Sequence, residues 1–295
     1  MASVVQRLAV LMTAGVPPSS AWTYLAPESS PIVAAVAERA VEGSPVAEAL
    51  VGHLEIVGPA ERQAWRGLAA AWRVATETGA GLAPTLREFA VSLRSLANAQ
   101  REIAVALAAP VATARLVMVL PLVGLLFGLV LGFDTLGILF TTGPGLACLG
   151  LGVALMLTAA AWNRRLVASA QPRDLTPGLR YELMAIAVSG GGSIDRASTA
   201  VAVALRSTGL DDVGDELGVD AVLALSRRAG VPAGELLRSE GEEARRSARA
   251  DAAAKASVLA VRLMLPLGLC VLPAFLLLGV APLLIAVITS TVSGF

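Results

Sequence analysis

The charged residues of this chain are confined to two blocks, and this distribution constrains the fold more than any other feature. Residues 116–163 contain one charged side chain, Asp134, and no charged residue follows Arg262. A helix needs about 20 apolar residues to cross the hydrocarbon core of a bilayer. Three uncharged runs are of this order or longer, namely Leu116–Phe133, Thr135–Trp162 and Leu263–Phe295. They predict a transmembrane hairpin joined near residues 134–143 and a C-terminal transmembrane segment.

The overall composition agrees with a membrane protein and excludes several other classes. Hydrophobic residues make up 56% of the 295 residues and charged residues 16%, whereas soluble domains carry about 25% charged residues. The formal net charge of +0 argues against a nucleic-acid-binding protein. Cys148 and Cys270 lie in apolar runs without a Cys or His at ligand spacing. We therefore interpret both as small hydrophobic residues.

Basic residues flank the predicted transmembrane segments on one side only. They are Arg101, Arg115, Arg164, Arg165, Arg173, Lys255 and Arg262. Cytoplasmic flanks of membrane helices are enriched in Lys and Arg. The pattern predicts a multi-pass protein with a cytoplasmic N-terminus, both polar blocks in the cytoplasm and an exterior C-terminus. Pro266, Pro273 and Pro282 should kink the last segment, which either crosses once or breaks within residues 278–284.

The polar blocks have helical periodicity with Gly, Pro and Ser punctuation, and they lack strand alternation. Helices are expected near residues 2–14, 17–26, 29–42, 44–52, 59–78, 81–107, 176–189, 193–207 and 214–229, with another that starts near 232 and runs into the last segment. Ser44 and Ser193 are predicted N-caps. The expected fold is all-α, with two tandem helical-bundle domains and three transmembrane helices. The predicted domains are residues 1–110 and 164–257, the hairpin is 111–163, and the C-terminal segment is 258–295.

Weak internal similarity runs through both blocks in the same order. "LAVLMTAGVPPSSAW" aligns with "MAIAVSGGGSIDRAS", which places Gly15 over Gly191. "TETGAGLAPTL" aligns with "RRAGVPAGELL", which places Gly79 over Gly230. We interpret this as a tandem duplication whose second copy is shorter. Each Gly lies where one helix ends and another begins, so we expect left-handed C-cap conformations and hinges there.

No catalytic, cofactor-binding or metal-binding pattern is present in the sequence, and we expect that the protein is not an enzyme. "VSGGGSIDRA" resembles a phosphate-binding turn but lacks a Lys and a preceding strand. The candidate partner-binding or hinge residues are Glu77, Gly79, Gly15, Gly191 and Gly230. Glu77 lies four residues after Arg73, a spacing that favours an intrahelical ion pair. Glu77 is therefore either a solvated member of that pair or a contact for a partner.

Three segments resemble the type II secretion system F family, the inner-membrane platform proteins of type II secretion, type IV pili and Tad pili. They are "LAVLMTAGVPPSSAW", "VEGSPVAEAL" and "TETGAGLAPTLREFA", in which Glu77 and Gly79 match the family element and Leu82 is one residue late. The second block departs from the pattern, with Ala229-Gly230 instead of an acidic residue and Gly. The compact size is more similar to the Tad-type branch.

The resemblance implies a bacterial inner-membrane protein that couples a cytoplasmic assembly ATPase to the insertion of pilin or pseudopilin subunits into a filament. It also implies contact with a second platform protein or self-association. No cofactor or nucleic acid is implied. Two alternatives from other classes are a small export permease and a membrane-anchored scaffold without a motor partner. A permease should have polar residues at mid-membrane, and the predicted segments have none.

Overall fold

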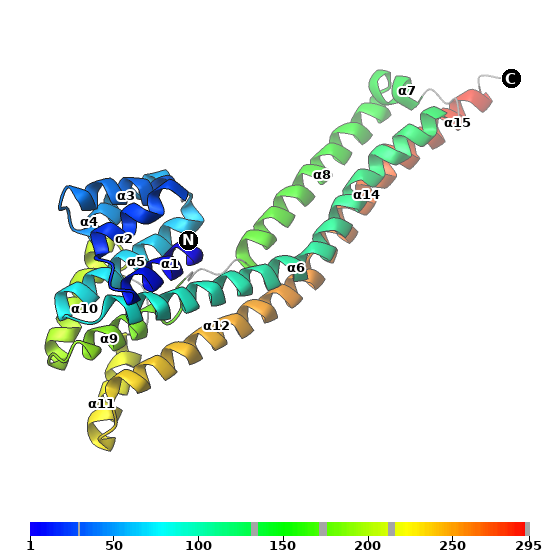
Figure 1. The fold of residues 1–295 in the computed structure, drawn as a ribbon. Coiled ribbons are helices and arrows are strands. Elements are labelled where there is room, and N and C mark those ends of the chain that lie inside the picture. Colours follow the sequence, from blue (N-terminus) through cyan, green and yellow to red (C-terminus); the bar gives the residue numbers. More distant parts are fainter. Residues whose placement is uncertain (29, 131–134, 171–175, 212–215, 293–295) are drawn as a thin grey trace. The chain divides into compact units, whose positions relative to one another are not determined.

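The computed structural model describes the main chain of residues 1–28, 30–130, 135–170, 176–211 and 216–292, and all secondary structure in these ranges is helical (Figure 1). The predicted all-helical class is thereby confirmed. The chain divides into two compact units: residues 1–100 with 173–250, and residues 101–172 with 251–295. Helices α6 (Leu82–Val130) and α12 (Ala233–Arg262) each begin in the first unit and continue into the second.

The first unit contains the helices predicted for the two polar blocks. Besides the first parts of α6 and α12, they are α1 (Ala2–Thr13), α2 (Pro18–Leu25), α3 (Pro31–Val41), α4 (Val46–Gly52), α5 (Pro59–Thr78), α9 (Leu179–Ser189), α10 (Ile194–Thr208) and α11 (Glu216–Ala229), with 3₁₀ turns η1 (Ala26–Glu28) and η2 (Leu54–Ile56). Most bounds agree with the predicted helices to within about two residues. The helix expected over 81–107 instead continues to Val130.

Helix α5 forms the centre of the first unit. The five consecutive residues Leu68–Trp72 are all buried, and a helix that is buried around its whole circumference must be covered on several sides. Helices α4, α9 and α10 pack against it. The Trp72 ring lies 5.8 Å from the ring of Trp22 on α2. The small residues at positions 69–71 are all alanines, which allows neighbouring helices to approach closely.

Residues from both polar blocks share one hydrophobic core. Trp65 and Leu68 of the first block belong to the same buried cluster as Leu183 and Leu205 of the second block. Because the two blocks bury their apolar faces together, the predicted domains 1–110 and 164–257 contribute to a common core. The predicted domain boundaries themselves stay a prediction.

Ser193 and Ser44 show opposite outcomes for the predicted caps. The Ser193 side chain accepts a hydrogen bond from the Arg196 N–H at the start of α10, so this N-cap is confirmed. The Ser44 N-cap is wrong, because Pro45 is the N-cap of α4 and no side-chain cap bond is made there. The Ser44 N–H donates to the Arg39 carbonyl, and Gly43 is left-handed. Ser44 therefore belongs to the C-terminal Schellman motif of α3.

The second unit contains the apolar helices. They are α7 (Thr135–Thr141), α8 (Gly143–Ala170), α13 (Met264–Pro266), α14 (Leu272–Phe275) and α15 (Ala281–Val292), with π-helical turns η3 (Leu267–Val271) and η4 (Leu276–Val280). The predicted connection at 134–143 contains the short helix α7 at residues 135–141, and Asp134 lies outside the described residues. The Thr142 hydroxyl accepts from the Gly145 N–H, which caps α8 and separates it from α7.

Two described helices are long and apolar enough to cross a membrane, Gly143–Ala168 and Ala233–Ile285. They overlap the second and third predicted segments at residues 143–162 and 263–285. The first predicted segment, Leu116–Phe133, lies in α6 as far as Val130 and then continues outside the described residues. Its described side chains include strongly exposed apolar ones, such as Leu116 at 74% and Val130 at 78%. Their exposure agrees with a lipid-facing surface, and the three-segment layout stays a prediction.

The prolines of the last apolar segment lie next to the π-helical turns. Pro273 and Pro282 are each the second residue after a π turn, η3 and η4 respectively. Proline lacks an N–H and its ring collides with the carbonyl four residues earlier, so a widened turn before it relieves the clash. Residues 278–284 are helical throughout, and the alternative of a break in this range is therefore wrong.

Close approach between helices of the second unit occurs at glycines. A Cβ atom added to Gly152 on α8 would lie 2.5 Å from Leu278 Cγ, and one added to Gly124 on α6 would lie 3.4 Å from the Gly279 Cα. Membrane helices associate through small residues that bring backbones together. Gly124 and Gly152 thus permit the packing of α6 and α8 against η4.

We predict that Gly152→Leu destabilises the second unit by about 1–3 kcal/mol, because the new side chain overfills the contact with Leu278. The matched control is Gly150→Leu on the same helix, where an added Cβ meets nothing within 4 Å. The measurements are the membrane abundance and the thermal unfolding midpoint of the purified full chain. Equal effects of the two substitutions would contradict the packing described here.

Candidate functional site

The four predicted glycine hinges are all left-handed. Their φ angles are +87° at Gly15, +74° at Gly79, +79° at Gly191 and +68° at Gly230. Each follows the last turn of a helix, where a left-handed residue satisfies carbonyls that the helix leaves unpaired. The predicted conformation is therefore confirmed, and the roles of these glycines as hinges or partner contacts stay predictions.

The structure brings the Gly79 corner against the Gly191 corner. A Cβ atom added to Gly190, the residue before Gly191, would collide with the main-chain carbonyl oxygen of Thr78. Thr78 is the last residue of α5, and Gly190 is the C-cap of α9. The ends of α5 and α9 are thus in direct contact. The internal alignment of the two polar blocks places Gly191 over Gly15 and does not indicate this contact.

Glu77 lies on the exposed last turn of α5 and makes the predicted ion pair. Arg73 Nε donates to Glu77 Oε1 at 2.7 Å. The Glu77 side chain is 39% exposed, so screening by solvent limits such a pair to roughly 0.3–0.5 kcal/mol. One carboxylate oxygen is used in this bond, and the group remains accessible to a second protein.

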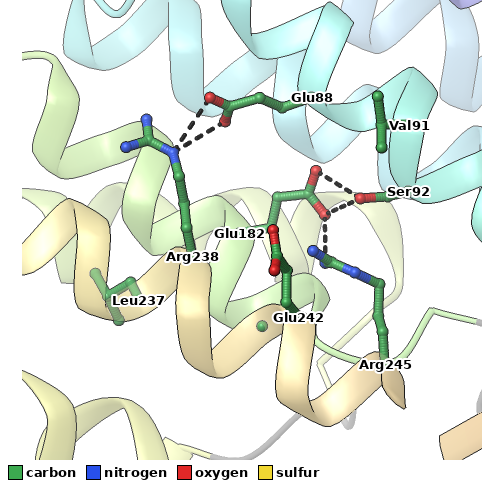
Figure 2. Close-up of a pocket in the computed structure, with 9 residues that line it drawn as sticks. Glu88, Val91, Ser92, Glu182, Leu237, Arg238, Glu242 and Arg245 are labelled. Carbon is green, nitrogen blue, oxygen red and sulfur yellow. Dashed lines mark hydrogen bonds and ion pairs between the residues drawn. The ribbon is translucent and has the colours of Figure 1, made fainter.

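A second cluster, which the sequence did not indicate, joins α6, α9 and α12 within the first unit (Figure 2). We call it the charged cluster, and it consists of Glu88, Ser92, Glu182, Arg238 and Arg245. Glu88 and Ser92 lie one turn apart on α6, and Arg238 and Arg245 lie two turns apart on α12. Helical neighbours at these spacings share a face. The charged faces of α6 and α12 therefore point toward each other, with Glu182 of α9 between them.

The pair between Glu88 and Arg238 is the more exposed part of the charged cluster. Arg238 Nε lies 3.2 Å from both carboxylate oxygens of Glu88. Both side chains are 41% exposed. Partly exposed ion pairs of this kind contribute about 0–1 kcal/mol, so this pair positions the helices more than it stabilises them.

Glu182 is the buried member of the charged cluster. Its residue is 8% exposed, and its Oε2 atom lies 3.4 Å from Arg245 Nη1. Ser92 Oγ lies 3.2 Å from both carboxylate oxygens, but its single proton can be donated to only one of them at a time. On folding, the Glu182 carboxylate therefore loses its hydrating water and gains one hydroxyl donor and one long contact to a guanidinium group.

This environment raises the pKa of Glu182 above its ordinary value of 4.5. Burial is the largest cause, Arg245 and Ser92 oppose it, and the negative charge of Glu88 adds to it. When desolvation outweighs the attraction of the partner, a buried ion pair contributes little net stability. Glu182 therefore holds its proton more tightly than an exposed glutamate does.

A cavity of about 220 Å³ lies beside these groups. Its charged lining comes from Glu182, from Glu88 on α6, and from Arg238, Glu242 and Arg245 on α12 (Figure 2). In the described ranges no group of three or more His, Cys, Asp or Glu side chains is placed to hold a metal ion. The arrangement allows the arginines to exchange ion-pair partners, and it allows Glu182 to bind and release a proton.

The charged cluster was missed because its members are far apart in the sequence. One signal was present: in "YELMAIAVS", the charged Glu182 directly precedes the apolar run that begins at Leu183. A charged residue on an otherwise buried helix face requires a partner. The sequence offered no means of choosing Arg245, 63 residues away, from the many arginines of the second block.

We predict that Gly190→Ala lowers the unfolding free energy by roughly 1–3 kcal/mol, because its Cβ collides with a carbonyl oxygen that cannot rotate away. Gly192→Ala is the matched control in the same corner, since its Cβ would lie 3.6 Å from the nearest atom, Arg196 Cδ. Thermal unfolding of the purified full chain measures both. A stable Gly190→Ala variant would show that α5 and α9 separate without cost.

We predict that Glu182 makes the protein less stable as the pH rises. Because the folded state binds the Glu182 proton more tightly than the unfolded state, this contribution is full below pH 4.5 and declines as the pH rises through the raised folded pKa. Glu182→Gln cannot titrate, so this decline disappears. The measurement is the difference in unfolding midpoint between wild type and variant from about pH 4 to pH 8. A constant difference would contradict the raised pKa.

Comparison with known proteins gives one family match. Residues 4–130, from α1 to the last residue of α6, match the model described as type II secretion system (T2SS), protein F. No curated protein and no solved structure matches the chain significantly. The family implies a role in secretion or pilus machinery in general, and the two apolar helices are consistent with an inner-membrane protein. Residues 4–130 are therefore similar to the type II secretion system F family.

Proposed function

We propose that this chain is the inner-membrane platform protein of a Tad-like pilus or type II secretion machine. In this role it couples a cytoplasmic assembly ATPase to the insertion of pilin or pseudopilin subunits into the filament. The observation that carries the proposal is the family match over residues 4–130. It ends in α6, a helix of 49 residues that connects the charged first unit to the apolar second unit.

The proposed mechanism is mechanical and requires no catalytic group in this chain. The ATPase supplies the energy and contacts the first unit, and the second unit contacts the subunits in the bilayer. In this proposal the N-terminus is cytoplasmic and the C-terminus is exterior, and a second platform protein or a second copy completes the assembly. Two helices of 49 and 30 residues, α6 and α12, support it because they provide continuous paths between the units.

Glu77 is the residue through which we test the proposed contact with the ATPase. We predict that Glu77→Arg leaves the protein folded in the membrane and lowers filament assembly roughly tenfold, the effect of about 1.4 kcal/mol at a binding interface. The fold is preserved because the pair with Arg73 is exposed and weak. Surface filaments and membrane abundance are measured in cells that carry the whole machine.

Two control variants separate the two interpretations of Glu77. Glu61→Arg makes the same change at an exposed position in the first turn of the same helix and should assemble filaments normally. The exchange Arg73→Glu with Glu77→Arg restores the intrahelical pair but keeps the reversed charge at position 77. Assembly restored by this exchange would reduce Glu77 to a member of a solvated pair. Normal secretion and filaments after deletion of the chain would overturn the platform role and favour a scaffold or a permease.

A further inference from the structure

The charged cluster lies at the start of both helices that leave the first unit. Glu88 is in the second turn of α6, and Arg238 is in the second turn of α12. Both helices continue into the second unit after residues 100 and 250. Apart from Glu182 of α9, the charged residues that line the cavity come from these two helices (Figure 2). The ion pairs thus connect two of the three chain segments that join the first unit to the second.

These contacts are suited to repeated opening. The outer pair, Glu88–Arg238, is half-exposed, so water can replace either partner. The inner pair has a contact of 3.4 Å between Glu182 and Arg245, longer than a strong charge-assisted hydrogen bond of about 2.8 Å. Burial of the carboxylate opposes its ionisation, which further weakens the hold on Arg245.

The cavity provides the room that opening requires. Its volume of about 220 Å³ exceeds that of several water molecules at about 30 Å³ each. A tightly packed apolar contact would have to break at once, because packed interiors do not deform gradually. Polar side chains beside an unfilled space can exchange partners in steps, and Glu242 of α12, which also lines the cavity, is a second acceptor for an arginine.

We propose that the charged cluster is a releasable clamp between the first turns of α12 and the helices α6 and α9, and that its opening lets α12 shift relative to α6 while Leu237 stays in the core. Only the biological role of the clamp rests on the proposed function. In a platform protein, the clamp determines whether movement of the first unit reaches both connecting helices together or α6 alone. The clamp itself is a property of the first unit and is tested without any partner.

Spin labels on α6 and α12 test the clamp in the full chain. Asn98→Cys and Ser247→Cys place labels on exposed positions of the two helices in the first unit. The native Cys148 and Cys270 are replaced by Ala in the same protein. We expect one narrow distance distribution in the wild-type cluster. Arg238→Glu faces Glu88 with a like charge and should add a second population at longer distance.

Charge exchange and a matched control distinguish clamp release from misfolding. Glu88→Arg together with Arg238→Glu restores an opposite pair and should return the single narrow distribution. Arg249→Glu makes the same change as Arg238→Glu at an exposed position of α12 that does not line the cavity, and it should leave the distribution unchanged. A single narrow distribution in Arg238→Glu would overturn the clamp, and so would a second population in Arg249→Glu.

The proposed function fails separately from the clamp. If Arg238→Glu opens the cluster but filament assembly and secretion do not depend on the chain at all, the clamp stands and the platform role falls. If assembly depends on the chain, we expect Arg238→Glu to reduce filaments and the charge exchange to restore them. Reduced filaments without restoration by the exchange, in a protein whose helix distance is restored, would show that the clamp does not serve assembly.

Discussion

The burial of α5 on all sides is the constraint on which the rest of the first unit depends. Five consecutive residues, Leu68–Trp72, have almost no exposure. Helices from the same polar block cannot cover this circumference alone, and α9 and α10 of the second block complete it. Burial of apolar side chains is the main stabilising contribution to folding. The two blocks therefore depend on each other for their core, although residues 111–163 separate them in the sequence.

This shared core determines where polar groups meet. Because α9 packs against α5, its C-cap Gly190 reaches the carbonyl of Thr78. On another side of α9, Glu182 lies among charged residues of α6 and α12. Apolar packing thus fixes one face of α9, while the buried Leu237 and the ion pairs together hold the start of α12. A structure with a firm core and exchangeable ion pairs beside it is suited to transmit movement without unfolding.

The two features of the site differ in their physical character. The glycine corners are defined by backbone conformation, since φ angles of +68° to +87° exclude most other residues. The charged cluster is defined by electrostatics in a partly buried space, where burial of Glu182 opposes its ionisation and Arg245 favours it. Glu77 at the first corner is exposed to partners. The charged cluster lies between helices of the same unit. In the proposed function, the glycine corner with Glu77 serves contact with a partner, and the charged cluster serves transmission of movement.

The sequence by itself determined the helices, the left-handed glycines, the Arg73–Glu77 pair and the apolar segments. Each depends on neighbours within about four residues, or on a run of similar residues, and such local patterns are visible in one dimension. It did not determine the Ser44 cap, because Ser44 follows the left-handed Gly43 and donates its N–H to the Arg39 carbonyl of the preceding helix. Only the tertiary structure decided the common core, the contact of Gly190 with Thr78 and the charged cluster. These contacts join residues 63 to 150 positions apart, and the packing of whole helices selects them from many pairs with equivalent chemistry.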